Sequence, residues 1–530
     1  MKRWDGWGDE EFEYRITESA IRYLSDMIGD GIRIVITPKN LIINKISSNK
    51  KITFPQASTS KEDRFLHSRG QSLPDWIDIK FNRVKTIPDG VIYPTNEDDV
   101  HELLKLASLK KKVVLIPFGG GTSVLGHINP LKDKRPILSV DMSKMRDLID
   151  LDKESQLAKF EAGVKGPDIE AQLRANGYTL GHYPQSFEYS TLGGWIATRS
   201  AGQESLKYGG IVDLFKGGVI ETPKGTLISK NYPASGAGID IRELILGSEG
   251  RLGIITKADV KISKIPEQED FYGVFFPTWK LGFSAVRQIV QMGLPLSMLR
   301  YSTKEETEIT LKLAGHSKLI GALESMLRIR GIGDEKCMLI LGLSGSRREL
   351  RFAKNAARDT IKKNKGVFAG KVFGEQWRKS RFKTPYLRNT LWDLGYAVDT
   401  LETATTWVNI PKMIKEIESS LKSTAETFNE RILVFTHLSH FYPTGGSIYT
   451  TVIFRIVDDP DELLDRWKQL KTAASEAIIR LGGTISHQHG VGLDHKQFLE
   501  QDKGELGVDL MSSIFKEIDP YGIMNPGKLV

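Results

Sequence analysis

The run PFGGGTS at 117–123 constrains the fold of this chain more than any other stretch, because three consecutive glycines directly follow the apolar run VVLIP. Without Cβ atoms, the backbone N–H groups of such a turn can approach an anion closely. The loop therefore predicts a bound phosphate or pyrophosphate. It matches neither the GxGxxG dinucleotide fingerprint nor a Walker A loop, which disfavours NAD and ATP. A tight turn after a strand, without a ligand, is the alternative.

Two more glycine clusters lie downstream, TLGGW at 191–195 and GSEGRLGII at 247–255, and the second runs into a strand-like segment. Each of them alone is compatible with ordinary turn chemistry. Together with the loop at 117–123, they predict three loops of one domain that contact a single long ligand.

Length and composition narrow the class of protein. With 530 residues the chain exceeds what one hydrophobic core usually serves, so roughly two to four domains are expected, and two fused domains are preferred. The single cysteine, Cys337, excludes an intrachain disulfide and any site that needs several cysteines, so redox chemistry would require an organic cofactor. The net charge of +8 is spread widely, and the sequence has no aromatic-rich RNA motif and no zinc finger. Nucleic acid is therefore not an expected partner.

The sequence has no uninterrupted apolar run near the ~20 residues that cross a bilayer. Its first residues, MKRWDGWGDEEFEYR, lack the apolar stretch of a secretory signal, and its last four, GKLV, do not match the peroxisomal SKL. We therefore expect a cytoplasmic protein.

Changes in pattern divide the chain into four segments. Residues 1–85 are predicted as an N-terminal extension, 86–268 as an α+β domain that carries the glycine clusters, 269–500 as a second domain, and 501–530 as a tail docked on the first domain. In the second domain, strand-like runs such as FYGVFFP and CMLILGLSG alternate with helical runs. This alternation is typical of an antiparallel sheet covered by helices.

The motif SHQHGVG at 486–492 holds two histidines, His487 and His489, separated by Gln488. On an extended backbone, residues two apart point to the same face, so the two imidazoles could converge on one ligand. A metal site, a proton relay and a substrate pocket are all compatible with this pattern. A simpler alternative is that one imidazole packs in the core and the other caps a loop.

Four motifs follow one another along the chain: PFGGGTSV, PQSFEYSTLGGW, GSEGRLGIIT and SHQHGVG. In this combination, and over nearly its full length, the chain resembles the vanillyl-alcohol-oxidase (PCMH-type) family of FAD-binding flavoproteins. The resemblance implies an α+β fold of two domains, one that binds FAD and one that caps the substrate. Relatives attach flavin covalently through a histidine in or beside the glycine loop, which FGGGTS lacks, so non-covalent FAD is expected. The residues expected to contact FAD are Pro117, Phe118, Gly119, Gly120, Gly121, Thr122, Ser123, Gln185, Ser186, Phe187, Glu188, Tyr189, Ser190, Thr191, Thr198, Arg199, Ser200, Ala201, Glu249, Gly250, Arg251, Leu252, Gly253, Ile254 and Ile255.

Within this family, the chain is most similar to the alkyl transferases of ether lipid biosynthesis. Those enzymes exchange the acyl chain of acyl-dihydroxyacetone phosphate for a long-chain fatty alcohol, through a flavin N5 adduct and without net redox. The resemblance therefore implies a lipid substrate. We also expect a homodimer and peripheral contact with a membrane surface.

The resemblance assigns roles to three residues. Tyr449, in GGSIYTT, matches the tyrosine that takes and returns a substrate proton, which requires that a cation or hydrogen bond stabilise the phenolate. Arg388, in PYLRNT, matches an arginine that binds the substrate phosphate through its planar guanidinium. Arg300, in SMLRYS, matches an arginine that contacts substrate or flavin. Without the resemblance, Tyr449 would be interpreted as a strand aromatic and Arg388 as a solvated charge.

One position departs from the family pattern, because relatives typically have three consecutive histidines where this chain has Gln488 in the middle. A glutamine can form hydrogen bonds but cannot shuttle a proton at neutral pH. We interpret His487 and His489 as catalytic residues in the polar wall of the substrate site. No metal is expected, since no clear third ligand accompanies them.

Two other functions remain open from the sequence. One is an FAD-dependent D-2-hydroxyacid dehydrogenase of the D-lactate or glycolate kind, because HGVG and NPGK fit the wider family. In that case a histidine would accept the hydroxyl proton. The other is a non-enzymatic lipid-binding or scaffold protein, which would leave a phenol, two arginines and two histidines without a joint purpose.

Overall fold

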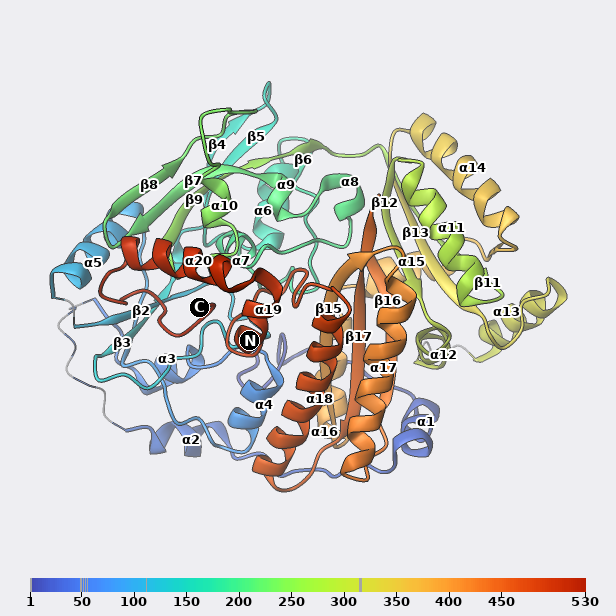
Figure 1. Cartoon of the computed structure of the whole chain (residues 1–530), viewed down its shortest axis with the longest axis horizontal. Coiled ribbons are helices and arrows are strands. Elements are labelled where there is room, and N and C mark those ends of the chain that lie inside the picture. The colour runs from blue at the N-terminus through green and yellow to red at the C-terminus, as the bar shows by residue number, and fades with distance from the viewer. Residues whose placement is uncertain are drawn as a thin grey trace.

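In the residues it describes (2–47, 50, 52, 54, 56–110, 112–313 and 317–530), the computed structural model has four β-sheets. Figure 1 shows these sheets in two regions that lie side by side. We call the elements from β1 (Gly90–Ile92) to β10 (Ser263–Lys264) the glycine-loop region. The elements from β11 (Gln268–Phe276) to α18 (Pro460–Arg480) form the large-sheet region.

The glycine loop follows β2 (Val114–Phe118), an edge strand of a three-stranded parallel sheet in the order β1, β3 (Ile137–Asp141), β2. Parallel neighbours cannot be joined by a tight turn, and α5 (Glu97–Lys110) lies between β1 and β2 in the chain. This helix forms because apolar residues recur at helical spacing and pack against the sheet. Its buried residues are Val100, Leu103, Leu104 and Ala107.

The second large sheet of the glycine-loop region is antiparallel, and helix α7 (Leu192–Thr198) packs against its strand β9. The hydroxyl of Thr191 caps this helix by accepting a hydrogen bond from the backbone N–H of Gly194 at 3.3 Å. The TLGGW cluster is therefore the first turn of a helix, and the prediction of a glycine loop at 191–195 is wrong. In sheet order, the strands are β4 (Leu148–Asp152), β5 (Leu157–Glu161), β9 (Ile254–Lys261), β7 (Phe215–Thr222) and β8 (Gly225–Ser229).

The large-sheet region is built on a seven-stranded sheet whose neighbouring strands all pair antiparallel. Helices α11 (Trp279–Gln291), α14 (Arg347–Lys363), α17 (Ile410–Thr427) and α18 cover one face of this sheet, as Figure 1 shows. The predicted α+β fold with a helix-covered antiparallel sheet is confirmed. In sheet order, the strands are β14 (Val367–Phe368), β11, β13 (Cys337–Gly345), β12 (Leu296–Ser302), β16 (Leu433–Tyr442), β17 (Gly445–Arg455) and β15 (Tyr396–Thr406).

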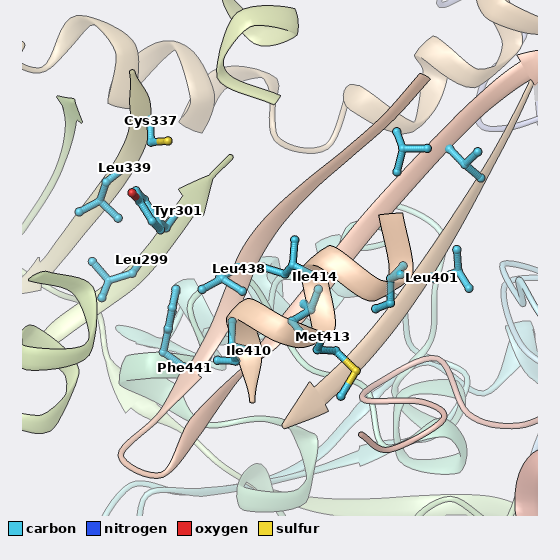
Figure 2. Close-up of a cluster of buried hydrophobic side chains, with 14 of the residues drawn as sticks. Leu299, Tyr301, Cys337, Leu339, Leu401, Ile410, Met413, Ile414, Leu438 and Phe441 are labelled. Carbon is cyan, nitrogen blue, oxygen red and sulfur yellow. The ribbon is translucent and has the colours of Figure 1, made fainter. Parts of the chain in front are cut away.

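Side chains along each of these strands point alternately to the two faces of the sheet, and this decides which of them enter the core. Leu299 and Tyr301 of β12 and Leu438 of β16 lie in the hydrophobic cluster between the sheet and its helices (Figure 2). Because successive side chains of a strand point to opposite faces, Arg300 and His437 lie on the other face. Both line a cavity there, and this face of the sheet therefore carries the candidate site.

The N-terminal segment packs on the large-sheet region. Helix α1 (Glu18–Ile28) buries Leu24 and Ile28 in a cluster with Tyr396 of β15. Helix α4 (Leu73–Lys80) places Trp76 edge-on to Trp392, with ring centroids 5.8 Å apart. Residues of this segment therefore help to position the helix that carries Arg388.

The C-terminal segment packs on the glycine-loop region. Met524 forms a parallel bridge with Leu115 of β2, and α20 (Glu505–Ile518) buries Phe515 in the core of that region (Figure 1). In the described part of the chain, no helix combines the length and apolar character needed to cross a bilayer. The other helices and strands are α2 (Lys39–Lys45), α3 (Lys61–Leu66), α6 (Gly166–Arg174), β6 (Tyr178–Thr179), α8 (Ser205–Tyr208), α9 (Ile211–Leu214), α10 (Arg242–Ile245), α12 (Lys304–Leu313), α13 (Ser317–Ile329), α15 (Val372–Ser380), α16 (Leu387–Asp393) and α19 (Leu499–Lys503).

Candidate active site

A cavity of ≈ 560 Å³ lies between the two regions, a volume in the range of small-molecule and cofactor sites. The glycine-loop region lines it with residues 117–123. The large-sheet region and the loop after α18 contribute Arg300, Arg388, Tyr449 and His489. Four of the five predicted catalytic residues therefore share one cavity with the glycine loop.

The glycine loop packs directly against the second predicted FAD motif. A Cβ atom on Gly120 would lie 1.8 Å from the carbonyl oxygen of Tyr189, and one on Gly119 would lie 2.3 Å from the Thr191 hydroxyl. Gly121 has a φ of +67°, in the left-handed region that favours glycine. Gly119 and Gly120 therefore allow two chain segments to approach each other at the cavity wall, and Gly121 allows the left-handed turn of the loop.

Glu249 joins the third glycine cluster to the histidine motif. Its carboxylate accepts hydrogen bonds from the backbone N–H groups of Val491 at 2.6 Å and Gly492 at 2.9 Å. The side chain of Asn525 donates to the carbonyl oxygen of Glu249 at 2.8 Å. The GSEG loop, the HGVG loop and the C-terminal NPGK segment are thus held together at one edge of the cavity.

Most of the predicted FAD contacts line the cavity, but not all of them do. Phe187 instead stacks on Phe382, with ring centroids 4.9 Å apart, and belongs to the core of the glycine-loop region. Arg199 pairs with Glu243 at 3.1 Å. The predicted residues outside the cavity wall are Phe187, Glu188, Tyr189, Arg199, Ala201, Arg251 and Leu252.

Tyr449 of β17 faces the cavity. Its hydroxyl donates to the side-chain oxygen of Gln185 at 3.4 Å, and its ring stacks on His437, with centroids 5.0 Å apart. Burial raises the pKa of Tyr449 to about 12. The residue is a neutral phenol at physiological pH, so it would act as a base only where neighbouring cations stabilise the phenolate.

Arg388 of α16 lies against the N-terminal segment. Its guanidinium packs 4.2 Å from the ring centroid of Trp76 and donates one hydrogen bond to the carbonyl oxygen of Gln71. Among the described residues, its buried Nε and Nη2 atoms have no hydrogen-bond partner. Burial lowers the pKa of Arg388 to about 10, so the group remains a cation. Buried unpartnered donors of this kind are suited to an anionic ligand.

Arg300 lies in a charged network that sequence reasoning missed. The carboxylate of Glu306, on α12, accepts from Arg300 and contacts His437 Nδ1 at 3.0 Å. Burial by itself would raise the pKa of Glu306, but His437 and Arg300 lower it to about 2. Glu306 occurs in the acidic run KEETE, where nothing in the sequence distinguishes it from Glu305, which is exposed, or Glu308, which is half-buried.

The two histidines of the motif converge on one carboxylate. His487 Nδ1 lies 3.2 Å from Oε1 of Glu402, and His489 Nε2 lies 3.5 Å from its Oε2. His489 lines the cavity, whereas His487 lies outside the cavity wall beside His440. The prediction that no third potential ligand accompanies the histidines is wrong, because β15 and β16 bring Glu402 and His440 to them.

Gln488 points in a different direction from its two neighbours. Its side-chain oxygen accepts a hydrogen bond from the backbone N–H of Ala201 at 3.1 Å, across the interface between the two regions. It also lines the cavity. Gln488 therefore has a contact of its own, separate from the one that His487 and His489 make with Glu402.

Two protein-family models match this chain. The model "FAD binding domain" matches residues 88–230, and "FAD linked oxidases, C-terminal domain" matches residues 265–529. FAD as the cofactor and the two-part FAD-binding fold are thereby confirmed.

Known proteins resemble the chain over most of its length. The alkyldihydroxyacetonephosphate synthase of Dictyostelium discoideum is 33% identical over 90% of this chain and 78% of its own. A solved structure of an alkyldihydroxyacetonephosphate synthase superposes with a TM-score of 0.86 at 28% identity, covering 100% of this chain and 99% of the other. The mitochondrial D-lactate dehydrogenase [cytochrome] of Arabidopsis thaliana is 26% identical over 93% of this chain and 80% of its own.

Proposed function

Because the chain belongs to the alkyldihydroxyacetonephosphate synthase family of FAD-binding flavoproteins, we propose that it exchanges the acyl chain of acyl-dihydroxyacetone phosphate for a long-chain fatty alcohol. The exchange releases a fatty acid and leaves an ether link, and no electrons are gained or lost overall. The lower identity to a D-lactate dehydrogenase makes the hydroxyacid dehydrogenase the weaker alternative.

The observation that carries this proposal is the shared position of Arg388 and Tyr449. A guanidinium with two unpartnered buried nitrogen atoms, among the described residues, lines the same cavity as a phenol. The guanidinium suits the phosphate of the substrate, and the phenol suits transfer of the proton on the adjacent carbon. One substrate could therefore engage both groups at once.

The cofactor would be held non-covalently by the cavity-lining members of the predicted FAD segments. When bound, FAD supplies an electrophilic flavin ring for the dihydroxyacetone-phosphate carbon at which the exchange occurs. Three segments support this assignment. All residues of 117–123 line the cavity, and so do some residues of 185–191 and of 248–255.

In this proposal Tyr449 accepts a proton from the substrate carbon and later returns it. Burial opposes this role because it raises the pKa of the phenol, whereas the positive charge of Arg300 lowers it. His489, whose ring centroid is 6.2 Å from that of Tyr449, is kept neutral by burial, which lowers its pKa. It would orient the substrate as a hydrogen-bonding wall.

An apolar end of the cavity supports a long-chain substrate. Aliphatic and aromatic side chains from α12, α15, α16 and the sheet enclose it, so an acyl or alkyl chain bound there would be removed from water. The apolar residues of this end are Ile309, Leu311, Met338, Ile340, Phe373, Trp377, Leu391, Val398, Phe435 and Ile453.

We further propose peripheral contact with a membrane surface through α15, and a homodimer in solution. Val372 is 58% exposed at the start of α15, while Phe373 and Trp377 of the same helix line the cavity. Arg378 and Lys379 follow in its last turn. Flotation with anionic liposomes, compared between the native chain and V372D, tests the contact, and light scattering tests the dimer.

The decisive assay uses purified FAD-loaded protein with palmitoyl-dihydroxyacetone phosphate and labelled hexadecanol. The proposal predicts labelled ether product and one fatty acid released per alcohol consumed, without bleaching of the flavin absorbance. Absence of product, together with bleaching by D-lactate, would establish the dehydrogenase instead. Absence of both, with unaltered ether lipids after gene deletion, would favour the non-enzymatic alternative.

A further inference from the structure

We infer that Glu402, His440 and His487 form a binding site for a divalent transition-metal ion of the zinc type, beside the cavity. One potential ligand atom from each residue lies within 4.8 Å of the others, and Glu402 and His440 are buried while His487 is half-buried. Two imidazoles and one carboxylate are a common ligand set for such ions. The three residues come from β15, the end of β16 and the loop after α18, so only the folded chain assembles them.

The outer hydrogen bonds of both histidines fit metal binding. Metal-bound histidines usually hold their second ring nitrogen in a hydrogen bond, which fixes the ring and its tautomer. His440 Nδ1 lies 3.0 Å from the Ser205 hydroxyl, and His487 Nε2 lies 2.6 Å from the Tyr442 hydroxyl. Each histidine thus has one nitrogen held by a hydroxyl, and the other nitrogen of His487, Nδ1, lies 3.2 Å from the Glu402 carboxylate of the proposed site.

Glu402 offers an acceptor for a cation on each of its two oxygen atoms. Its Oε1 atom lies 3.2 Å from His487 Nδ1. Among the described residues, its Oε2 atom is buried without a hydrogen-bond partner.

The geometry requires only modest adjustment. Zinc binds nitrogen and oxygen ligands at about 2.0–2.2 Å, so ligand atoms around one ion lie nearer one another than the upper limit of 4.8 Å found here. The rings of His440 and His487 lie face to face, with centroids 4.9 Å apart, so small shifts of both rings would be needed to bring the three ligand atoms to bonding distance of one ion. His489 Nε2 lies 3.5 Å from Glu402 on the side of the cavity, and is not one of the three proposed ligands.

The location of the site suggests an effect on the proposed reaction, and this part of the inference rests on the proposed function. Glu402 of β15 pairs directly with Tyr449 of β17, so their side chains share one face of the sheet. An ion bound by Glu402 would therefore place a positive charge on the same face of the sheet as the proposed base.

Metal content tests the site. Purified FAD-loaded protein is equilibrated with ZnCl2 and dialysed, and its zinc is measured by mass spectrometry; about one ion per chain is expected. H440A and H487A should lose this zinc. H101A is the matched control, because His101 pairs with Glu221 at 2.9 Å in a histidine–carboxylate contact far from the site, and it should keep the ion.

Two milder variants keep the test decisive if the ligand variants do not fold. S205A and Y442F leave the three ligands in place but remove the outer hydroxyls, and should weaken zinc binding roughly 10–100-fold. Native protein without zinc, or zinc affinity unchanged in both milder variants, would overturn the site. Zinc binding without alkyl transfer would refute the proposed function alone, and alkyl transfer without zinc binding would refute the metal site alone.

Discussion

Gln488 accepts a hydrogen bond from the backbone N–H of Ala201 at 3.1 Å, and so connects the loop after α18 to the segment that follows α7. A histidine at this position could accept from the same N–H only through a ring nitrogen, and its side chain differs from that of glutamine in length and in the direction of the acceptor. The substitution therefore changes a contact between two regions of the protein.

Loss of this acceptor should loosen the cofactor site. We expect Q488L to weaken FAD binding roughly fivefold, since one hydrogen bond contributes about 1 kcal/mol. Q488E is the matched control, because it keeps an oxygen at the same reach and should retain more of the affinity. Fluorescence titration of the FAD-free proteins measures the FAD affinity of both variants. Equal affinities in Q488L and the native chain would contradict this role.

Substitution of Gly120 should abolish FAD binding. The Cβ atom of G120A would lie 1.8 Å from the Tyr189 carbonyl oxygen, a backbone atom, so the loop must move out of the position in which it lines the cavity. Gly236 is the control, because a Cβ atom there meets nothing within 4 Å. The flavin absorbance of the purified proteins reports the outcome: G236A should be yellow and G120A colourless. A yellow G120A protein would refute the packing argument.

Removal of the Arg388 guanidinium should impair binding of the phosphorylated substrate. We expect R388M to lower kcat/KM roughly 10–100-fold, mainly through KM, because charge-assisted hydrogen bonds contribute about 1.5–3 kcal/mol. R388K should recover part of the loss, since lysine keeps the charge but not the planar donor pair. K383M, at an exposed position, is the control for the removal of a positive charge. A change confined to kcat would argue against a phosphate role.

The phenol of Tyr449 should control the pH dependence of alkyl transfer. With a pKa raised to about 12, the phenolate fraction below that pH increases roughly tenfold per pH unit, so the rate of the native enzyme should rise with pH. Y449F should lose a factor of roughly 10²–10⁴ in kcat and show no such rise. Transfer rates of both enzymes, measured from neutral to mildly alkaline pH, test this role. The FAD content of each protein checks that it is folded. A Y449F enzyme with a native pH profile would exclude the tyrosine as the base.

Glu306 should act as a positioning residue for Arg300 and His437. Its pKa in the folded chain, about 2, lies below the ordinary 4.5, so the ionised carboxylate stabilises the fold above that ordinary value. This stabilisation is lost as the pH falls from about 4.5 toward 2. Denaturant titrations at neutral and acidic pH should therefore show a smaller acid-induced loss of stability in E306Q than in the native chain.

The exposed neighbour Glu305 provides the control for that experiment. E305Q removes the same charge from the same helix and should leave both the acid response and the transfer rate close to native. E306Q should also lower kcat, because Arg300 and His437 lose the carboxylate that holds them. If E305Q and E306Q behave alike, Glu306 has no special positioning role.

Local patterns made much of the fold predictable. The strand before the glycine loop and helix α18 follow from apolar spacing, which acts over a few residues at a time. The same local analysis failed at TLGGW, because two glycines suggested a loop, whereas the Thr191 hydroxyl and the buried Leu192 and Trp195 favour a helix.

The candidate site was predictable only in part. Tyr449, Arg388 and Arg300 were found because each lies within a motif that resembles a known family. Glu306 and His440 lie in no such motif, and their neighbours in sequence do not distinguish them. Their contacts with the other site residues depend on the pairing of strands that lie far apart in the sequence.

By itself, the sequence determined which segments form strands and helices and where the glycine loop lies, because backbone freedom and side-chain spacing act locally. The FAD cofactor followed instead from the resemblance of four motifs to a known family. Tertiary structure alone decided that Glu402 faces Tyr449 and meets His487, that Gln488 contacts Ala201, and that Arg388 has donors in the cavity without a partner among the residues that the structure describes. These relationships depend on strand register and on packing between two regions. They arise only when segments that are distant in the chain pack together and bury their apolar surface from water.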